Sequence, residues 1–138
     1  MLEITRFSLE KHRGPYERWP QKTRLVADGA MLDLAIGGYT LLRQFETEAG
    51  YLLVTDYDCM YEEVISFTLV DKACTRVLSH RQIGAPYQTY WLGDVVWKDP
   101  WRFEATMENS DLQASFTIRK IHIPGFYPQL GMRLSRGD

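Results

Sequence analysis

Hydrophobic and polar residues alternate with a period of two along much of this chain, which is the pattern of a β-strand with one buried face. From Trp101 to Met107 every second side chain is apolar, and those between them are charged or carry a hydroxyl. Residues 112–118 show the same alternation. Turn signals separate such segments, among them Asp28-Gly29, which suits a tight two-residue hairpin. The pattern therefore predicts an all-β protein.

The alternation and the turn signals together predict eight or nine strands. We place them at residues 23–27, 30–36, 39–48, 51–57, 62–70, 74–80, 87–98, 101–108 and 112–123. The apolar spacing of residues 2–13 fits a strand about as well as a helix, so the N-terminal segment is expected to be irregular or short and helical. Residues 124–128 are interpreted as an irregular lid over a sheet edge or core opening.

Short links between successive strands favour antiparallel neighbours and hence a meander. Eight or nine strands in a small domain must roll up or stack to remove their edges, as a barrel or as a two-sheet sandwich. We expect one all-β domain over residues 1–138, built as an antiparallel meander that is curved or barrel-like.

The composition is that of an ordinary globular protein, with 45% hydrophobic and 25% charged residues and a net charge of −2. It excludes a wholly disordered chain, and a weak net charge does not favour nucleic acid as a partner. No apolar run is long enough for a membrane span, and the first residues do not resemble a secretory signal, so we expect a cytoplasmic location. Cys59 and Cys74 flank a predicted strand and are expected to be reduced.

The weak net charge hides an uneven distribution. Residues 1–24 carry six basic and three acidic side chains, whereas residues 25–63 carry one basic and eight acidic side chains. The densest part is the segment 56–63, which has four carboxylates interleaved with two tyrosines and a methionine. In an antiparallel meander, Glu46 and Glu48 should lie at the opposite end of the strand that precedes this segment.

Three interpretations of the acid-rich segment 56–63 remain open: a solvated turn, a cation site, or a docking surface for a basic partner. The segment lacks the spacing and the glycine of a calcium loop, so we expect no metal and no cofactor. Exposed tyrosines supply contact area and carboxylates supply charge complementarity, which favours docking. The predicted partner-binding residues are Glu46, Glu48, Asp56, Tyr57, Asp58, Tyr61, Glu62 and Glu63.

This surface leads to the functional hypothesis of a non-enzymatic, cytoplasmic protein-binding domain. One concrete example is an immunity-type inhibitor that blocks the basic active site of a partner toxin. No phosphate-binding loop or nucleophile elbow is present, and the three histidines are scattered, so an enzyme is not expected. If the chain were an enzyme, its candidate groups would be Glu46, Asp56, Cys59 and His80.

An alternative is a small-molecule-binding β-barrel with an aromatic-lined interior, because a barrel of about eight strands can hold one small ligand. The three tryptophans, Trp91, Trp97 and Trp101, would otherwise form an aromatic corner of the hydrophobic core. The candidate pocket residues are Trp91, Trp97, Trp101, Phe103 and Phe116.

Overall fold

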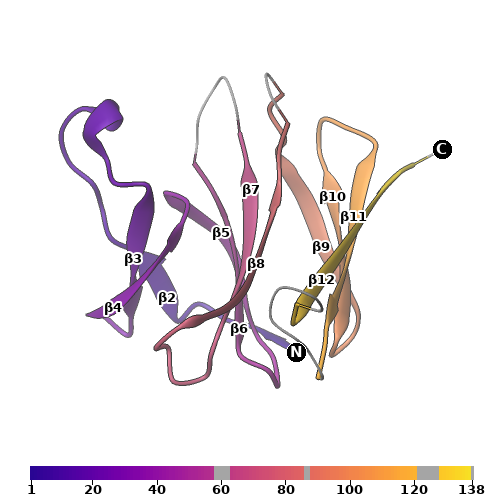
Figure 1. The fold of residues 1–138 in the computed structure, drawn as a ribbon, viewed down its shortest axis with the longest axis horizontal. Coiled ribbons are helices and arrows are strands. Elements are labelled where there is room, and N and C mark those ends of the chain that lie inside the picture. Colours follow the sequence, from indigo (N-terminus) through magenta and orange to yellow (C-terminus); the bar gives the residue numbers. More distant parts are fainter. Residues whose placement is uncertain (58–62, 86–87, 121–127, 138) are drawn as a thin grey trace.

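The computed structural model describes residues 1–57, 63–85, 88–120 and 128–137. This part of the chain forms antiparallel β-sheets and contains no α-helix, so the all-β prediction is confirmed (Figure 1). The predicted short helix at the N-terminus is not seen; residues 2–9 instead contribute strands β1 (Leu2–Glu3) and β2 (Phe7–Leu9). A single 3-10 turn follows at Tyr16–Arg18, between two prolines that prevent a longer helix.

Three sheets account for all of the described strands. The central sheet has the order β1-β5-β6-β7-β8, with β5 (Thr40–Glu46), β6 (Tyr51–Asp56), β7 (Ile65–Val70) and β8 (Val77–Ile83). The C-terminal sheet has the order β12-β11-β10-β9, with β9 (Leu92–Asp99), β10 (Arg102–Met107), β11 (Leu112–Ile118) and β12 (Leu130–Arg136). The N-terminal sheet has the order β2-β3-β4, with β3 (Lys22–Ala27) and β4 (Ala30–Gly37).

The three sheets are stacked in layers, and the central sheet is covered on both faces (Figure 1). Strand β6 shows why: Leu52 and Val54 belong to the core shared with the C-terminal sheet, whereas Tyr51 and Leu53 belong to the core shared with the N-terminal sheet. Because neighbouring side chains in a strand point to opposite faces, a run of apolar residues can fill both cores. All five residues Tyr51–Thr55 are accordingly buried.

The prediction of a single, barrel-like meander is wrong. The described strands form three separate sheets, β1 pairs with β5 and not with its neighbour in sequence, and none of the sheets closes on itself. The cause lies in β6, whose apolar run needs a layer on each face, and in β7, whose six residues are all buried, so the sheets remove their apolar surfaces by stacking instead of curling. Strand β12 was also not predicted, and it completes the C-terminal sheet through its pairing with β11.

Each of the nine predicted segments contains a strand, but one strand is displaced along the sequence. The segment predicted at 74–80 becomes β8, which begins only at Val77. The side chain of Asp71 accounts for the delay, because its carboxylate accepts hydrogen bonds from Thr75 N at 2.7 Å and Arg76 N at 3.0 Å and so holds residues 71–76 in a turn. These bonds, with that from the Thr75 hydroxyl first, lower the pKa of Asp71. Among the described residues, no helix is long and apolar enough to cross a membrane.

Candidate functional site

The predicted partner-binding residues lie at two opposite ends of the central sheet. Glu46 is opposite Tyr51 in the β5–β6 register, and Asp56 is opposite Thr40 at the other end of the same pair. At about 3.3 Å per residue, the length of β6 separates the two ends by roughly 16 Å. Glu46 and the start of the acid-rich segment at Asp56 therefore lie at opposite ends of β6, and the structure does not bring these two carboxylates together.

One carboxylate of the acid-rich segment, that of Glu63, is buried. Glu63 is 2% exposed, and its Oε1 accepts a hydrogen bond from the backbone N–H of Tyr57 at 2.6 Å. Its carboxylate thus holds the two ends of the segment together from the inside. Glu46 is half-exposed and lies 3.9 Å from the Nζ of Lys72. Asp58, Cys59, Tyr61 and Glu62 lie outside the described residues.

The predicted pocket aromatics line no barrel interior, because the sheets are open. Phe103 and Phe116 are each 1% exposed and stack with ring centroids 4.6 Å apart in the core between the central and C-terminal sheets. Trp97 packs on Phe103 at 4.6 Å. Trp101 packs at the edge of the same core, and Trp91 is 53% exposed. Of the three tryptophans, Trp97 and Trp101 thus pack against the core, and Trp91 does not.

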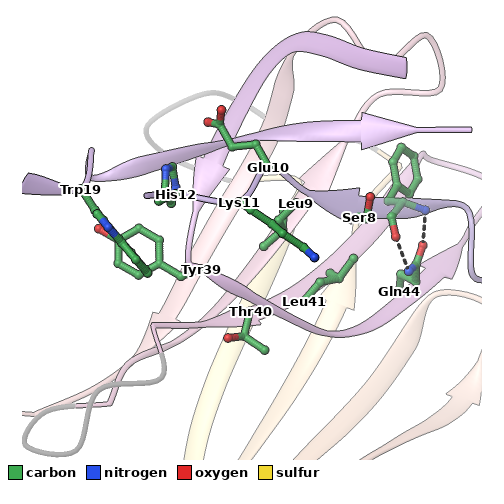
Figure 2. Close-up of a pocket in the computed structure, with 11 residues that line it drawn as sticks. Ser8, Leu9, Glu10, Lys11, His12, Trp19, Tyr39, Thr40, Leu41 and Gln44 are labelled. Carbon is green, nitrogen blue, oxygen red and sulfur yellow. Dashed lines mark hydrogen bonds between the residues drawn. The ribbon is translucent and has the colours of Figure 1, made fainter. Parts of the chain in front are cut away.

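A groove that the sequence did not indicate lies between the N-terminal and central sheets, where β2 diverges from β5 (Figure 2). Its volume is about 540 Å³, and residues 7–12 form one wall while residues 39–41 and Gln44 form the other. Trp19 and Tyr39 lie at one end, and Gln44 lies at the other (Figure 2). Between them, Leu9 and Leu41 supply apolar surface and Lys11 supplies a positive charge.

The outer edge of β2 lies along this groove. Strand β2 is at the border of its sheet and pairs with β3 alone. Asp28 N donates to Arg6 O, and Glu10 N donates to Arg24 O, which makes the even-numbered residues of β2 the ones that bond to β3. The N–H and C=O groups of Phe7 and Leu9 therefore point away from β3, toward the groove.

The side chain of Gln44 pairs with one of these two residues as a neighbouring strand would. Its Oε1 accepts from Phe7 N at 2.8 Å, and its Nε2 donates to Phe7 O at 3.0 Å (Figure 2). Leu9 comes next along the same edge, and the structure shows no hydrogen bond from a described residue to its outward backbone groups. The groove thus contains one unused pairing position beside a position already filled by an amide.

Aromatic rings close the other end of the groove. Trp19 meets Tyr39 edge to face with ring centroids 5.1 Å apart, and Tyr16 lies 5.2 Å from Trp19. His12 lies 5.3 Å from both Trp19 and Tyr39. Tyr16 is 45% exposed, so the cluster offers ring surface to solvent. Flat, rigid side chains of this kind lose little entropy on binding and are common anchors at interfaces.

Hydrogen bonds hold the loop that carries these rings. Trp19 Nε1 donates to Gly14 O at 3.1 Å, and the Tyr39 hydroxyl donates to Pro20 O at 2.7 Å. The Thr23 hydroxyl donates to Gly38 O at 2.6 Å, so the 2.9 Å contact between Thr23 and His12 requires His12 Nε2 to carry the proton. The aromatic end of the groove is therefore built before any ligand binds.

The candidate catalytic and metal-binding groups do not form a site in the described part of the chain. No group of three or more histidine, cysteine, aspartate or glutamate side chains that could hold a metal ion occurs there. Cys74 is a free thiol, and its partial burial raises its pKa, which disfavours the nucleophilic thiolate. His80 lies on β8 opposite Thr68, and strands β7 and β6 separate it from Glu46 on β5.

Comparisons with protein-family models, with curated proteins and with solved structures find no match to this chain. Its function is therefore argued from its geometry alone. The groove of Figure 2 has built walls, an aromatic end and an unused backbone edge, which makes it the best-supported candidate site.

Proposed function

We propose that the chain is a non-enzymatic protein-binding domain that holds an extended segment of its partner in the groove between β2 and β5. The observation that carries the proposal is the outward-facing backbone of Leu9, at an unpaired strand edge that lines a groove with an aromatic end. An extended peptide can join such an edge as an added strand, so that main-chain hydrogen bonds supply affinity and side-chain pockets supply specificity.

The walls of the groove indicate which segment fits. An apolar side chain of the added strand would pack between Leu9 and Leu41, which are both half-buried. A ring or proline at its end would stack on Trp19 and Tyr39. The groove wall carries one charge of each sign, Lys11 and Glu10, and the Glu10 carboxylate already accepts a hydrogen bond from Arg24 N at 2.8 Å. Lys11 is exposed, so it is the charge that an acidic residue of the peptide would meet.

The acid-rich segment is a second proposed contact, for a basic partner surface such as a toxin active site. Its support is the exposed Glu48 at one end of the central sheet and the position of Asp56 and Tyr57 at the other. Glu63 is removed from the contact surface by its burial. A cytoplasmic location and an immunity-type role both remain predictions.

A peptide selection tests the groove. The whole chain is used to select binders from a displayed library of extended peptides, and the affinity of a selected peptide is measured by calorimetry. Leu9→Pro, which removes the outward N–H, and Trp19→Ala should each weaken binding about tenfold or more. Trp91→Ala is the matched control, because Trp91 is exposed on another sheet and should leave affinity unchanged.

Hydrogen exchange at the Leu9 amide distinguishes strand addition at β2 from a general change in the stability of the fold. The Leu9 amide should exchange quickly in the free protein and slowly in the peptide complex. Selected peptides that leave the Leu9 amide in fast exchange, or that bind Leu9→Pro and Trp19→Ala as well as the unaltered chain, would refute strand addition at β2.

A further inference from the structure

A second cavity lies between the N-terminal sheet and the outer face of β7 and β8. Its volume is about 240 Å³, less than half that of the groove. Ala35, Ile36 and Val77 form an apolar part of the wall. The polar part comes from side chains of β3, β7 and β8 and from Tyr57. A cavity of this size suits a small molecule and excludes a peptide strand.

The hydroxyl of Thr68, at the wall of the cavity, makes no hydrogen bond to a described residue of the protein. Its side chain is on the face of β7 that lines the cavity, and the residue is 1% exposed. Its Oγ1 has no hydrogen-bond partner among the residues that the structure describes. Buried hydroxyls are normally paired, because leaving one unpaired costs the hydration that it lost. Thr68 therefore lines the cavity with a buried hydroxyl that lacks a hydrogen-bond partner.

Lys22 from β3 is the one charged group near neutral pH in the described wall of the cavity, and no carboxylate belongs to that wall. His80 from β8 lines it as well. The other ionisable group there is Tyr57, whose pKa is raised by burial, so it carries no negative charge near neutral pH. Burial and the nearby charge of Lys22 lower the pKa of His80. A negative ligand would relieve this positive potential.

We propose that this cavity binds a small organic carboxylate with a short apolar body. The carboxylate accepts hydrogen bonds from the Thr68 hydroxyl and from Lys22, and the apolar body packs against Ile36 and Val77. Gln82 closes the site from β8, where its Nε2 already donates to Ser66 Oγ at 3.3 Å. The site is separate from the groove and does not depend on the proposed function.

The test uses sodium benzoate as the probe and benzamide, its neutral isostere, as the matched ligand. The His80 ring signals are followed by NMR in the full chain while each compound is added. Benzoate should shift these signals saturably and raise the pKa of His80, and benzamide should bind at least tenfold more weakly, because it lacks the charge.

Two substitutions assign the contacts. Thr68→Val removes the unpaired hydroxyl and keeps the shape, so it should lower benzoate affinity roughly tenfold without loss of thermal stability. Lys22→Met should weaken benzoate to a similar extent, and Lys98→Met, whose lysine pairs with Glu104 on another sheet, should have no effect.

Equal binding of benzoate and benzamide would overturn the proposal, as would an affinity that both Thr68→Val and Lys22→Met leave unchanged. Inorganic phosphate that binds as tightly as benzoate would also overturn it, because the apolar wall would then contribute nothing. If no probe shifts the His80 signals, the cavity holds only water, and the proposal is wrong.

Discussion

The carboxylate of Glu63 is buried at 2% exposure and accepts a hydrogen bond from Tyr57 N. Glu63→Ala removes the acceptor and leaves a buried N–H unpaired, so the free energy of unfolding should fall by about 1–3 kcal/mol. Glu63→Gln keeps an acceptor oxygen and should cost less. Urea denaturation measures both, with Glu48→Ala as the exposed control, expected within about 0.5 kcal/mol of the unaltered chain. A neutral Glu63→Ala would contradict the structural role.

His80 makes the stability of the fold depend on pH. Burial first, and Lys22 second, lower its pKa in the folded state below the ordinary value of 6.5. The unfolded chain therefore binds more protons as the pH falls through 6.5, so the stabilisation is complete above this pH and is lost toward the folded-state pKa. His80→Gln should lose less stability than the unaltered chain between pH 7.5 and pH 5.5, measured by urea denaturation. Equal losses in the two proteins would contradict the assignment.

At the level of strands, the alternation of apolar and polar residues identified the strands that have one solvent-exposed face. It failed where the alternating pattern was short or absent. Strands β10 and β11 were predicted within two residues at their starts because each alternates cleanly. The apolar run of β6 and the alternation of β7 indicated strands but not that both faces are covered. No strand was predicted at β12, although Leu130, Met132 and Leu134 alternate there with glycine, arginine and serine.

The groove could not be predicted in the same way, because it depends on segments far apart in the sequence. Gln44 reaches Phe7 across a separation of 37 residues, and Tyr39 meets Trp19 only after the N-terminal loop folds back. No local pattern marks Gln44 as the amide that pairs with β2. The sequence does contain a segment, residues 2–13, whose pattern does not distinguish a strand from a helix. It also contains aromatic residues at Tyr16, Trp19 and Tyr39.

The hydrogen bonds along β2 lead to a prediction about individual amides. In the free protein, the amides of Ser8 and Glu10 should be protected from exchange by β3, and that of Phe7 by Gln44. Gln44→Ala should then speed exchange at Phe7 and leave Ser8 unchanged, because the bond to β3 is intact. NMR-detected hydrogen exchange resolves the residues separately. Protection of Phe7 that persists in Gln44→Ala would show that its outward N–H has another partner.

For the molecule as a whole, the stacking of three sheets explains how a short chain with many strands keeps the apolar faces of its sheets out of solvent. The central sheet supplies both cores, and the outer sheets keep one polar face each, as the alternation of β11 shows. Charges of opposite sign meet at one end of the central sheet. The N-terminal segment 1–24, which builds one wall of the groove, carries more basic than acidic side chains, and the acid-rich segment begins beside the groove, because Asp56 pairs with Thr40 and the Tyr57 ring lies 5.0 Å from that of Tyr39.

Stacking on both faces of the central sheet has a direct test in two neighbouring leucines. Leu52 and Leu53 are each fully buried, the first in the core with the C-terminal sheet and the second in the core with the N-terminal sheet. Leu52→Ala and Leu53→Ala should therefore each lower the free energy of unfolding by about 2–5 kcal/mol. In a barrel or a two-layer sandwich, one of these neighbours would face water and its truncation would cost little.

The adjacent pair Phe116 and Thr117 on β11 is the matched control, because that strand has one buried and one exposed face. Phe116→Ala should cost about 3–5 kcal/mol and Thr117→Ala no more than about 0.5 kcal/mol. Chemical denaturation of the four variants then compares the strand covered on both faces with the strand covered on one. If Leu53→Ala resembled Thr117→Ala, the N-terminal sheet would not cover the central one, and the groove between them would lose its second wall.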